Sequence, residues 1–147
     1  MSGPPVLIRA LRYAWALPNS ALGAILAVSA LASGGRAAMV DGVLEAHGGL
    51  VTFVLRHMVP LQGGASAMTL GHVVLGRDAA SLERTRAHER AHVRQYETWG
   101  LLFIPAYVMA SIVVASRGLH YYRDNRFERV AVAAARTHRP PDGGFSL

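Results

Sequence analysis

The sequence predicts a mainly helical α+β fold. Three observations indicate this class. The chain has 147 residues, which suits one compact domain. Long apolar or helix-favouring stretches occupy most of it. Two stretches rich in strand-forming residues lie between them, bounded by glycine and aspartate. We therefore expect an N-terminal apolar helix, a small antiparallel β element and two later helices that carry the candidate site residues.

Composition narrows the function classes. Apolar residues make up 52% of the chain and charged residues 16%, which excludes a disordered chain and favours a membrane-associated or very apolar domain. The formal charge is +6, but the arginines are scattered and no aromatic-rich strand accompanies them, so we expect no nucleic-acid partner. The absence of cysteine excludes disulfides, thiolate metal sites and a thiol nucleophile.

Residues 1–36 are expected to form a basic arm followed by an apolar, membrane-associated helix. Pro18 interrupts the apolar run and predicts a turn, with Asn19 or Ser20 as the N-cap of a helix over residues 21–33. That helix is about 20 Å long, shorter than the roughly 30 Å hydrocarbon core of a bilayer. It is expected to insert in the membrane or lie on it, and a buried core helix is the alternative.

A domain that binds metal is expected over residues 37–138. The stretches 37–48 and 66–78 predict an antiparallel sheet of two or three strands. Residues 50–59 between them are apolar and either helical or irregular. Residues 139–147 complete the chain as a flexible tail, because they contain two prolines and two glycines.

The strongest predicted helix begins at Asp78 and ends at Gly100. Asp78 is a good N-cap and Gly100 a good helix terminator. An uncharged run over residues 101–116 follows, and Gly118 ends it. A last helix is expected over roughly residues 124–137.

The helix that starts at Asp78 contains an HExxH motif, His88-Glu89-Arg90-Ala91-His92. Two histidines four residues apart lie on one face of a helix, one turn apart, as two ligands of a zinc ion do. Glu89 lies on the adjacent face, where a carboxylate can act as general base on a water that zinc activates. The alternative is that both histidines are ordinary polar residues of a charged helix.

Catalytic zinc usually has three protein ligands, so a third ligand is needed. The metzincin pattern is excluded, because Gln95 and Thr98 stand where its glycine and third histidine would be. Among the glutamates, only Glu128 follows Glu97, and it lies in the last predicted helix.

The segments AHERAHVRQYETWG and RDNRFERVA, within residues 70–135, together resemble small bacterial proteins with gluzincin-type zinc sites. The resemblance extends to membrane-associated metallopeptidases. It implies that His88, His92 and Glu128 bind Zn²⁺, that Glu89 is the general base, and that the protein acts at the bacterial inner membrane. One departure stands out, because Val132 replaces the acidic residue that often supports such a site. Asp124, one turn before Glu128, is an alternative support or an alternative ligand.

The zinc hypothesis also constrains the run over residues 101–116. A single membrane crossing by this run would place Glu128 on the opposite side from His88, and 16 residues cannot cross twice. The run must therefore pack beneath the site or lie in the membrane interface, with a kink at Pro105 that turns the chain back.

The sequence thus predicts a zinc-dependent hydrolase, a membrane-associated metallopeptidase with a peptide or protein substrate and membrane lipid as a partner. Oligomeric state is left open. One alternative is a non-catalytic, zinc-binding structural or accessory membrane protein. The other is a two-span membrane protein with a chance HExxH match. No single residue stands out as the transition-state stabiliser; the candidates are His72, His120, Tyr121 and Tyr122.

Overall fold

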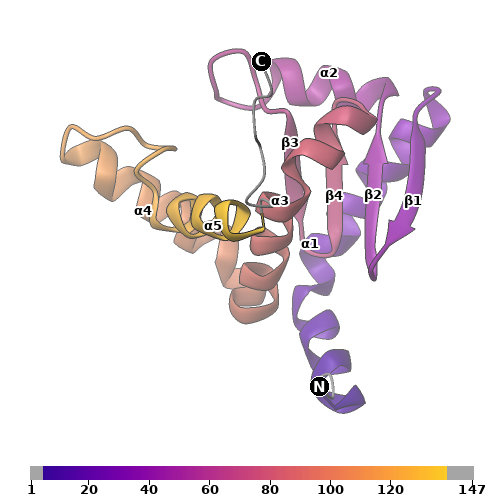
Figure 1. Cartoon of the computed structure of the whole chain (residues 1–147), viewed down its shortest axis with the longest axis horizontal. Coiled ribbons are helices and arrows are strands. Elements are labelled where there is room, and N and C mark those ends of the chain that lie inside the picture. The colour runs from indigo at the N-terminus through magenta and orange to yellow at the C-terminus, as the bar shows by residue number, and fades with distance from the viewer. Residues whose placement is uncertain (1–4, 139–147) are drawn as a thin grey trace, which may run out of the picture.

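The computed structural model describes residues 5–138, so the predicted tail at 139–147 lies outside the described residues. The fold class is confirmed as mainly helical α+β (Figure 1). In chain order the elements are α1 (Val6–Ala32), β1 (Arg36–Val40), β2 (Val43–His47), α2 (Gly49–His57), β3 (Ala67–Leu70), β4 (Val73–Gly76), α3 (Ala79–Trp99), the 3-10 turn η1 (Gly100–Leu102), α4 (Phe103–Ser116) and α5 (Arg126–Thr137).

The sheet is larger and less uniform than the sequence predicted. Its four strands have the order β1-β2-β4-β3. The two outer pairs are antiparallel hairpins, but β2 and β4 run parallel, so the expectation of a purely antiparallel element of two or three strands is wrong. There are four strands because each strand-like stretch contains its own tight turn, and the parallel pair joins one strand from each stretch. Asp41 and Gly42, both at positive φ, close the first turn, and Gly71 at φ 62° lies in the second.

Helix α1 differs from the prediction as well. It continues through Pro18 instead of turning there, and it is 27 residues long. Asn19 and Ser20 do not cap a helix, because both bond to other parts of the fold. The Asn19 amide donates to the carbonyl of Gly100, and the Ser20 hydroxyl accepts from the backbone N–H of His72. Tertiary contacts therefore use the polar residues that the sequence assigned to a turn.

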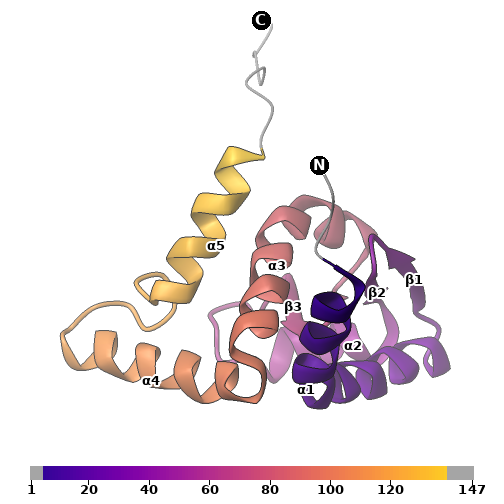
Figure 2. The same ribbon diagram turned by 90° about the horizontal axis from the view of Figure 1, so that it is seen from below.

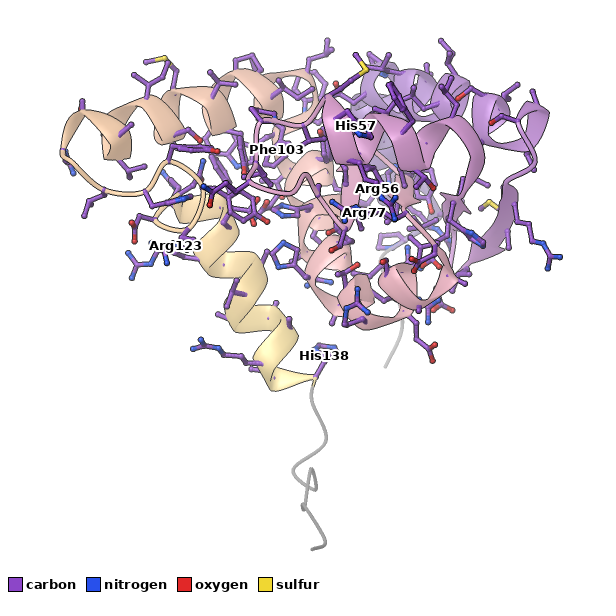
Figure 3. The ribbon with its side chains drawn as sticks, turned by 90° about the horizontal axis from the view of Figure 1, so that it is seen from above. Arg56, His57, Arg77, Phe103, Arg123 and His138 are labelled. Carbon is purple, nitrogen blue, oxygen red and sulfur yellow. The ribbon has the colours of Figure 1, made fainter. Side chains whose placement is uncertain are left out.

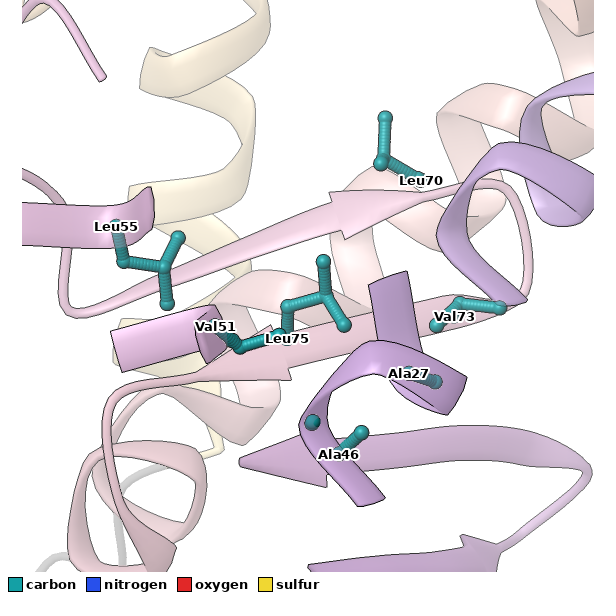
Figure 4. Close-up of a cluster of buried hydrophobic side chains, with 8 residues drawn as sticks. Ala27, Ala46, Val51, Leu55, Leu70, Val73 and Leu75 are labelled. Atoms are coloured by element: carbon teal, nitrogen blue, oxygen red, sulfur yellow. The ribbon is translucent and has the colours of Figure 1, made fainter. Parts of the chain in front are cut away.

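Helices α1 and α3 cover opposite faces of the sheet. Because side chains alternate along a strand, Val73 and Leu75 of β4 face α1 and α2, while Val74 faces α3. Figure 4 shows the larger cluster, in which small residues of α1 let the helix approach the sheet closely. Gly23 of α1 also lies close to the sheet: a Cβ at this position would lie 2.7 Å from that of Val73.

Beyond α3 the chain turns twice and brings α5 back onto α3 (Figures 1 and 2). The predicted kink at Pro105 is not the cause. Pro105 lies in the first turn of α4, where the missing N–H of proline is tolerated. The first turn of the chain is η1, after Gly100. The second follows Gly118, which has φ 74° and bonds to Ala115, while Leu119 bonds to Val114.

Two helical stretches of the described residues are long and apolar enough to cross a membrane by length and composition. One is α1. The other runs over residues 79–116, and little of its most apolar window is buried. Core helices and leader segments can have the same properties, so these stretches are weak evidence for membrane association.

Candidate metal centre

Helix α3 presents the HExxH residues, and both of its ends form as predicted. The Asp78 side chain accepts a hydrogen bond from the backbone N–H of Ser81 at 2.7 Å, which lowers the Asp78 pKa. Gly100 ends the helix at φ 54° and bonds back to Tyr96. Between these ends, His88 and His92 lie one turn apart on the side of α3 that faces α5 and α4.

Helix α5 supplies Glu128, and a buried asparagine sets its position. Asn125 is fully buried and caps α5 by accepting from the N–H of Phe127. Its amide also donates to the carbonyl of Tyr107 and the hydroxyl of Ser111, both in α4. The first turn of α5 is therefore fixed against α4, and Glu128 lies in that turn with 4% of its surface exposed.

The structure brings His88, His92 and Glu128 into one group. One ligand atom from each lies within 4.8 Å of the others, a geometry that could hold a metal ion. The Nε2 atoms of the two histidines are 3.1 Å apart, and the carboxylate oxygens of Glu128 lie 3.1 Å from His88 Nε2 and 3.3 Å from His92 Nε2. Three nitrogen and oxygen ligands thus converge on one point.

The hydrogen bonds within the group do not satisfy all of its polar atoms. Oε2 of Glu128 is buried and has no hydrogen-bond partner, because its 3.1 Å approach to His88 lacks hydrogen-bonding geometry. Only one hydrogen can lie between the two facing Nε2 atoms. Buried polar atoms are normally satisfied, so an unpaired carboxylate oxygen beside two imidazoles indicates a place for a cation.

The charges of the group are strongly coupled. Burial by itself would raise the pKa of Glu128, but the adjacent His88 and His92 lower it far below its usual range. Burial likewise favours the neutral form of His92, and Glu128 outweighs this effect and raises the His92 pKa. Glu128 is therefore ionised at neutral pH, as a metal ligand must be.

Gln95 fixes the orientation of the His92 ring. The Gln95 amide nitrogen donates to the carbonyl of Phe127, so its oxygen faces His92 Nδ1, 2.8 Å away. His92 must then donate from Nδ1, and in its neutral form it presents the lone pair of Nε2 to the other two ligands. Histidines that bind metals are commonly held in this way. Gln95 supplies the support that the sequence prediction sought at Val132.

Glu89 is buried beside the group but is not one of its three converging ligands. The hydroxyl of Thr69, on strand β3, donates to Glu89 Oε2 at 2.6 Å. A carboxylate held next to a candidate metal position, with one oxygen fixed by a neutral donor, keeps its other oxygen for proton transfer.

A cavity of about 520 Å³ opens beside the group. The candidate ligands, Glu89 and Thr69 form its polar part. Most of its remaining wall is apolar and comes from the loop after α2, from β3 and from α4. The Tyr107 hydroxyl donates to Glu128 Oε1 at 2.7 Å, and burial beside Glu128 raises the pKa of Tyr107 and Tyr122 well above the usual range. Both tyrosines are neutral donors at this wall.

Some of the other candidate residues from the sequence lie at the site, and others lie elsewhere in the molecule. Tyr121 and Tyr122 line the cavity. Asp124, the alternative ligand, accepts from the backbone N–H of His120 in the α4–α5 loop and does not belong to the metal-binding group. His72 lies elsewhere, stacked on Tyr13 and bonded to Glu97.

Three residues of the site were missed by sequence reasoning: Thr69, Gln95 and Tyr107. Gln95 lies three residues after His92, a spacing that places both on one helix face, so the sequence contained a usable signal for it. Thr69 and Tyr107 contained none, because their roles depend on how β3 and α4 pack around α3.

The fold and the group together define a class: a small helical α+β protein with a buried His-His-Glu group that could hold a metal ion. Comparison with protein-family models, curated proteins and solved structures finds no match for this chain. The resemblance to gluzincin-type metallopeptidases therefore rests on the motif and the His-His-Glu group.

Proposed function

We propose that the protein is a zinc-dependent hydrolase that cleaves peptide bonds. The observation that carries this proposal is the convergence of His88, His92 and Glu128, with one carboxylate oxygen unpaired, beside a second buried carboxylate, Glu89. Two imidazoles and one carboxylate match the ligand set of catalytic zinc sites. Three ligands also leave one tetrahedral position for water or substrate.

Zinc at this point would act as a Lewis acid, polarising a substrate carbonyl and making water more acidic. The chain's own residues complete the reaction. Glu89 accepts a proton from the attacking water and returns it to the leaving amine, so the peptide bond is replaced by a carboxylate and an amine. Thr69 keeps Glu89 in place. Tyr122, a neutral donor at the cavity wall, is in a position to bond to the developing oxyanion.

The competing proposal is a non-catalytic protein in which zinc joins α3 to α5. One observation favours it: the three ligands come from these two helices, so metal binding would contribute directly to folding. A structural zinc site usually has four protein ligands. Within residues 5–138 the group has three, which favours the hydrolase.

We further propose that the protein is located at a membrane. The resemblance implies the bacterial inner membrane. The apolar character of α1 and α4 supports it.

The test combines metal analysis with an activity assay on a fluorogenic peptide library. The wild-type protein is expected to contain one zinc ion per chain. Glu89→Gln should keep the zinc and lose at least about a hundredfold in hydrolysis, the usual contribution of a general base. His88→Ala should lose both. Zinc retained in His88→Ala contradicts the site. Equal hydrolysis in wild type and Glu89→Gln contradicts the role of Glu89, whereas a wild-type protein that holds zinc and hydrolyses no peptide favours the structural alternative.

A further inference from the structure

Three helices of this small protein expose large apolar side chains to the surroundings. More than half of the surface of Ile25 and Val28 in α1, Phe53 in α2, and Met109 and Ile112 in α4 is exposed. Figure 2 shows α1 and α4 along one edge of the molecule, with α5 and the sheet on its other side. Exposed apolar surface on this scale marks an interaction site.

Figure 3 shows this edge from the opposite direction. Side chains without nitrogen project from α4 and α1 along the upper edge, while the labelled Arg77, Arg123 and His138 lie below it. These three basic side chains therefore lie away from the upper edge, whereas the labelled Arg56 and His57 belong to α2 itself. We name the exposed apolar surface of α1, α2, η1 and α4 the apolar face.

The segments that form the apolar face contain no acidic residue. Residues 1–40 contain no acidic residue, and neither do residues 46–77 or 98–123. These three segments include α1, α2 and α4. The basic residues within or just after α1 and α4 are Arg9, Arg12, Arg36, Arg117 and Arg123. Arg12 lies 3.7 Å from Glu97 of α3, and the other four arginines lie in segments without acidic residues. An apolar surface flanked mainly by basic residues is complementary to a bilayer with anionic headgroups, to which each arginine near the surface adds binding energy.

The packing of α1 on the sheet limits how the apolar face can bind a bilayer. The buried positions of α1 are Ala16, Asn19, Gly23, Ala27 and Ala30, which are spaced along more than half of the helix. If α1 crossed the membrane, the sheet packed on these positions would enter the hydrocarbon with its charged residues, at a cost of several kcal/mol for each charge. Helix α4 has 14 residues, about 21 Å, which is too short to cross.

We propose that the protein binds an anionic lipid bilayer through the apolar face, with α1 and α4 lying in the plane of the membrane interface and neither helix crossing it. The charged faces of α3 and α5 and the Glu45 ion pairs remain on the aqueous side. This arrangement keeps His88 and Glu128 on the same side of the membrane, as their contact requires.

The bilayer location has a consequence for the substrate, which rests on the proposed hydrolase function. Helix α4 belongs to the apolar face and also forms a wall of the cavity, where Ile104, Val108 and Ile112 line the space beside the metal-binding group. The cavity is therefore next to the lipid. Its substrate class is an apolar peptide segment presented at the membrane surface.

Flotation with vesicles tests the docking. The purified full-length chain is mixed with vesicles of phosphatidylcholine, with or without phosphatidylglycerol. We expect binding that is stronger with phosphatidylglycerol and weaker in high salt. Ile25→Glu and Met109→Glu should each reduce the bound fraction roughly tenfold, because a charge in the apolar face opposes insertion. Val130→Glu is the matched control and should bind normally: Val130 and Met109 are equally exposed, at 59%, but Val130 lies on α5.

Three outcomes would overturn the proposal. One is vesicle binding that none of the apolar-face variants weakens. Another is a lipid-free dimer whose formation Met109→Glu abolishes, with no vesicle binding, because a second copy would then cover the face. The third comes from labelling Arg9→Cys and Arg36→Cys in membrane vesicles with an impermeant maleimide: opposite sides would mean that α1 crosses. All measurements are repeated with His88→Ala, so that loss of zinc is separated from loss of docking.

Discussion

Helix α3 holds a buried glutamate on each of two sides, in two different ways. On one side Arg86 and Arg90, four residues apart, bind Glu45 of β2. On the other, His88 and His92, also four residues apart, meet Glu128 of α5. The spacing and the carboxylate are the same, and only the basic residue differs.

The two clusters differ in whether the carboxylate is satisfied. Both oxygens of Glu45 accept bonds of 3.0 Å from guanidinium groups, which carry a permanent charge and several donors each. Glu128 is left with Oε2 unpaired, because its approach to His88 lacks hydrogen-bonding geometry and the Nδ1 donor of His92 is directed to Gln95. The carboxylate of the arginine cluster is paired without a ligand, although Arg90 Nη1 in the same cluster has no partner, whereas the carboxylate of the histidine cluster has an unpaired oxygen where a cation could bind.

The largest expected effect is on metal content. His92→Ala should reduce zinc from one ion per chain to at most about a tenth of that, because two protein ligands remain from a set of three. Arg90→Ala, a change on the same helix in the other cluster, should retain the zinc if it folds. Inductively coupled plasma mass spectrometry measures both. Equal zinc loss in the two variants would mean that the clusters do not differ as described.

The next largest effect is on the free energy of unfolding, which should respond differently to changes in the arginine cluster and in the histidine cluster. Glu45→Ala leaves the guanidinium of Arg90 largely buried without its partner, and breaking such a pair costs about 3 kcal/mol. Urea unfolding should show this loss both with and without zinc. Glu128→Ala should instead remove the stabilisation by added zinc that the wild-type protein shows. If zinc stabilises Glu128→Ala as it does the wild type, Glu128 is not a ligand.

A smaller effect is expected from changing Gln95, which orients the His92 ring. Gln95→Leu should weaken zinc binding by about tenfold to a hundredfold, because His92 loses the acceptor that fixes its orientation. Gln95→Glu supplies an acceptor again and should bind zinc at least as tightly as the wild type. Titration against a chelator of known affinity measures both variants. An unchanged affinity in Gln95→Leu would remove Gln95 from the site.

The smallest effect concerns Glu89 and requires the hydrolase to be active. Thr69→Val removes the hydroxyl that holds Glu89 and should lower kcat roughly tenfold while zinc content stays at one per chain. Thr69→Ser keeps the hydroxyl and should restore most of the rate. A variant that changes KM alone, or that loses zinc, would show that Thr69 does not act through Glu89.

Sequence reasoning predicted the fold class and named the residues of the candidate site. It succeeded where the signal lies within one short segment of the chain. His88, Glu89 and His92 lie within five residues of one helix, and that helix has a clear cap at Asp78 and a clear stop at Gly100. Glu128 was implied by the resemblance to gluzincin-type sites, and Asp124 stayed open as an alternative. Helix geometry and zinc chemistry were sufficient for the HExxH residues but not for the choice between Glu128 and Asp124.

Sequence reasoning failed where residues distant in the chain compete for the same groups. Asn19 and Ser20 are good capping residues, yet they bond to Gly100 and His72, and α1 runs on past Pro18. The parallel pairing of β2 with β4 depends on where α2 and β3 return the chain. Local propensity says nothing about either, because both follow from tertiary contacts.

The sequence alone therefore determined the candidate ligand types, their spacing on α3 and the lack of acidic residues in the apolar helices α1 and α4, because these properties belong to single segments. Only the tertiary structure decided that Glu128 and not Asp124 joins the histidines, that Gln95 and Thr69 support the site, and that α1 is packed along the sheet. These facts depend on the distances between segments, which packing sets and composition does not.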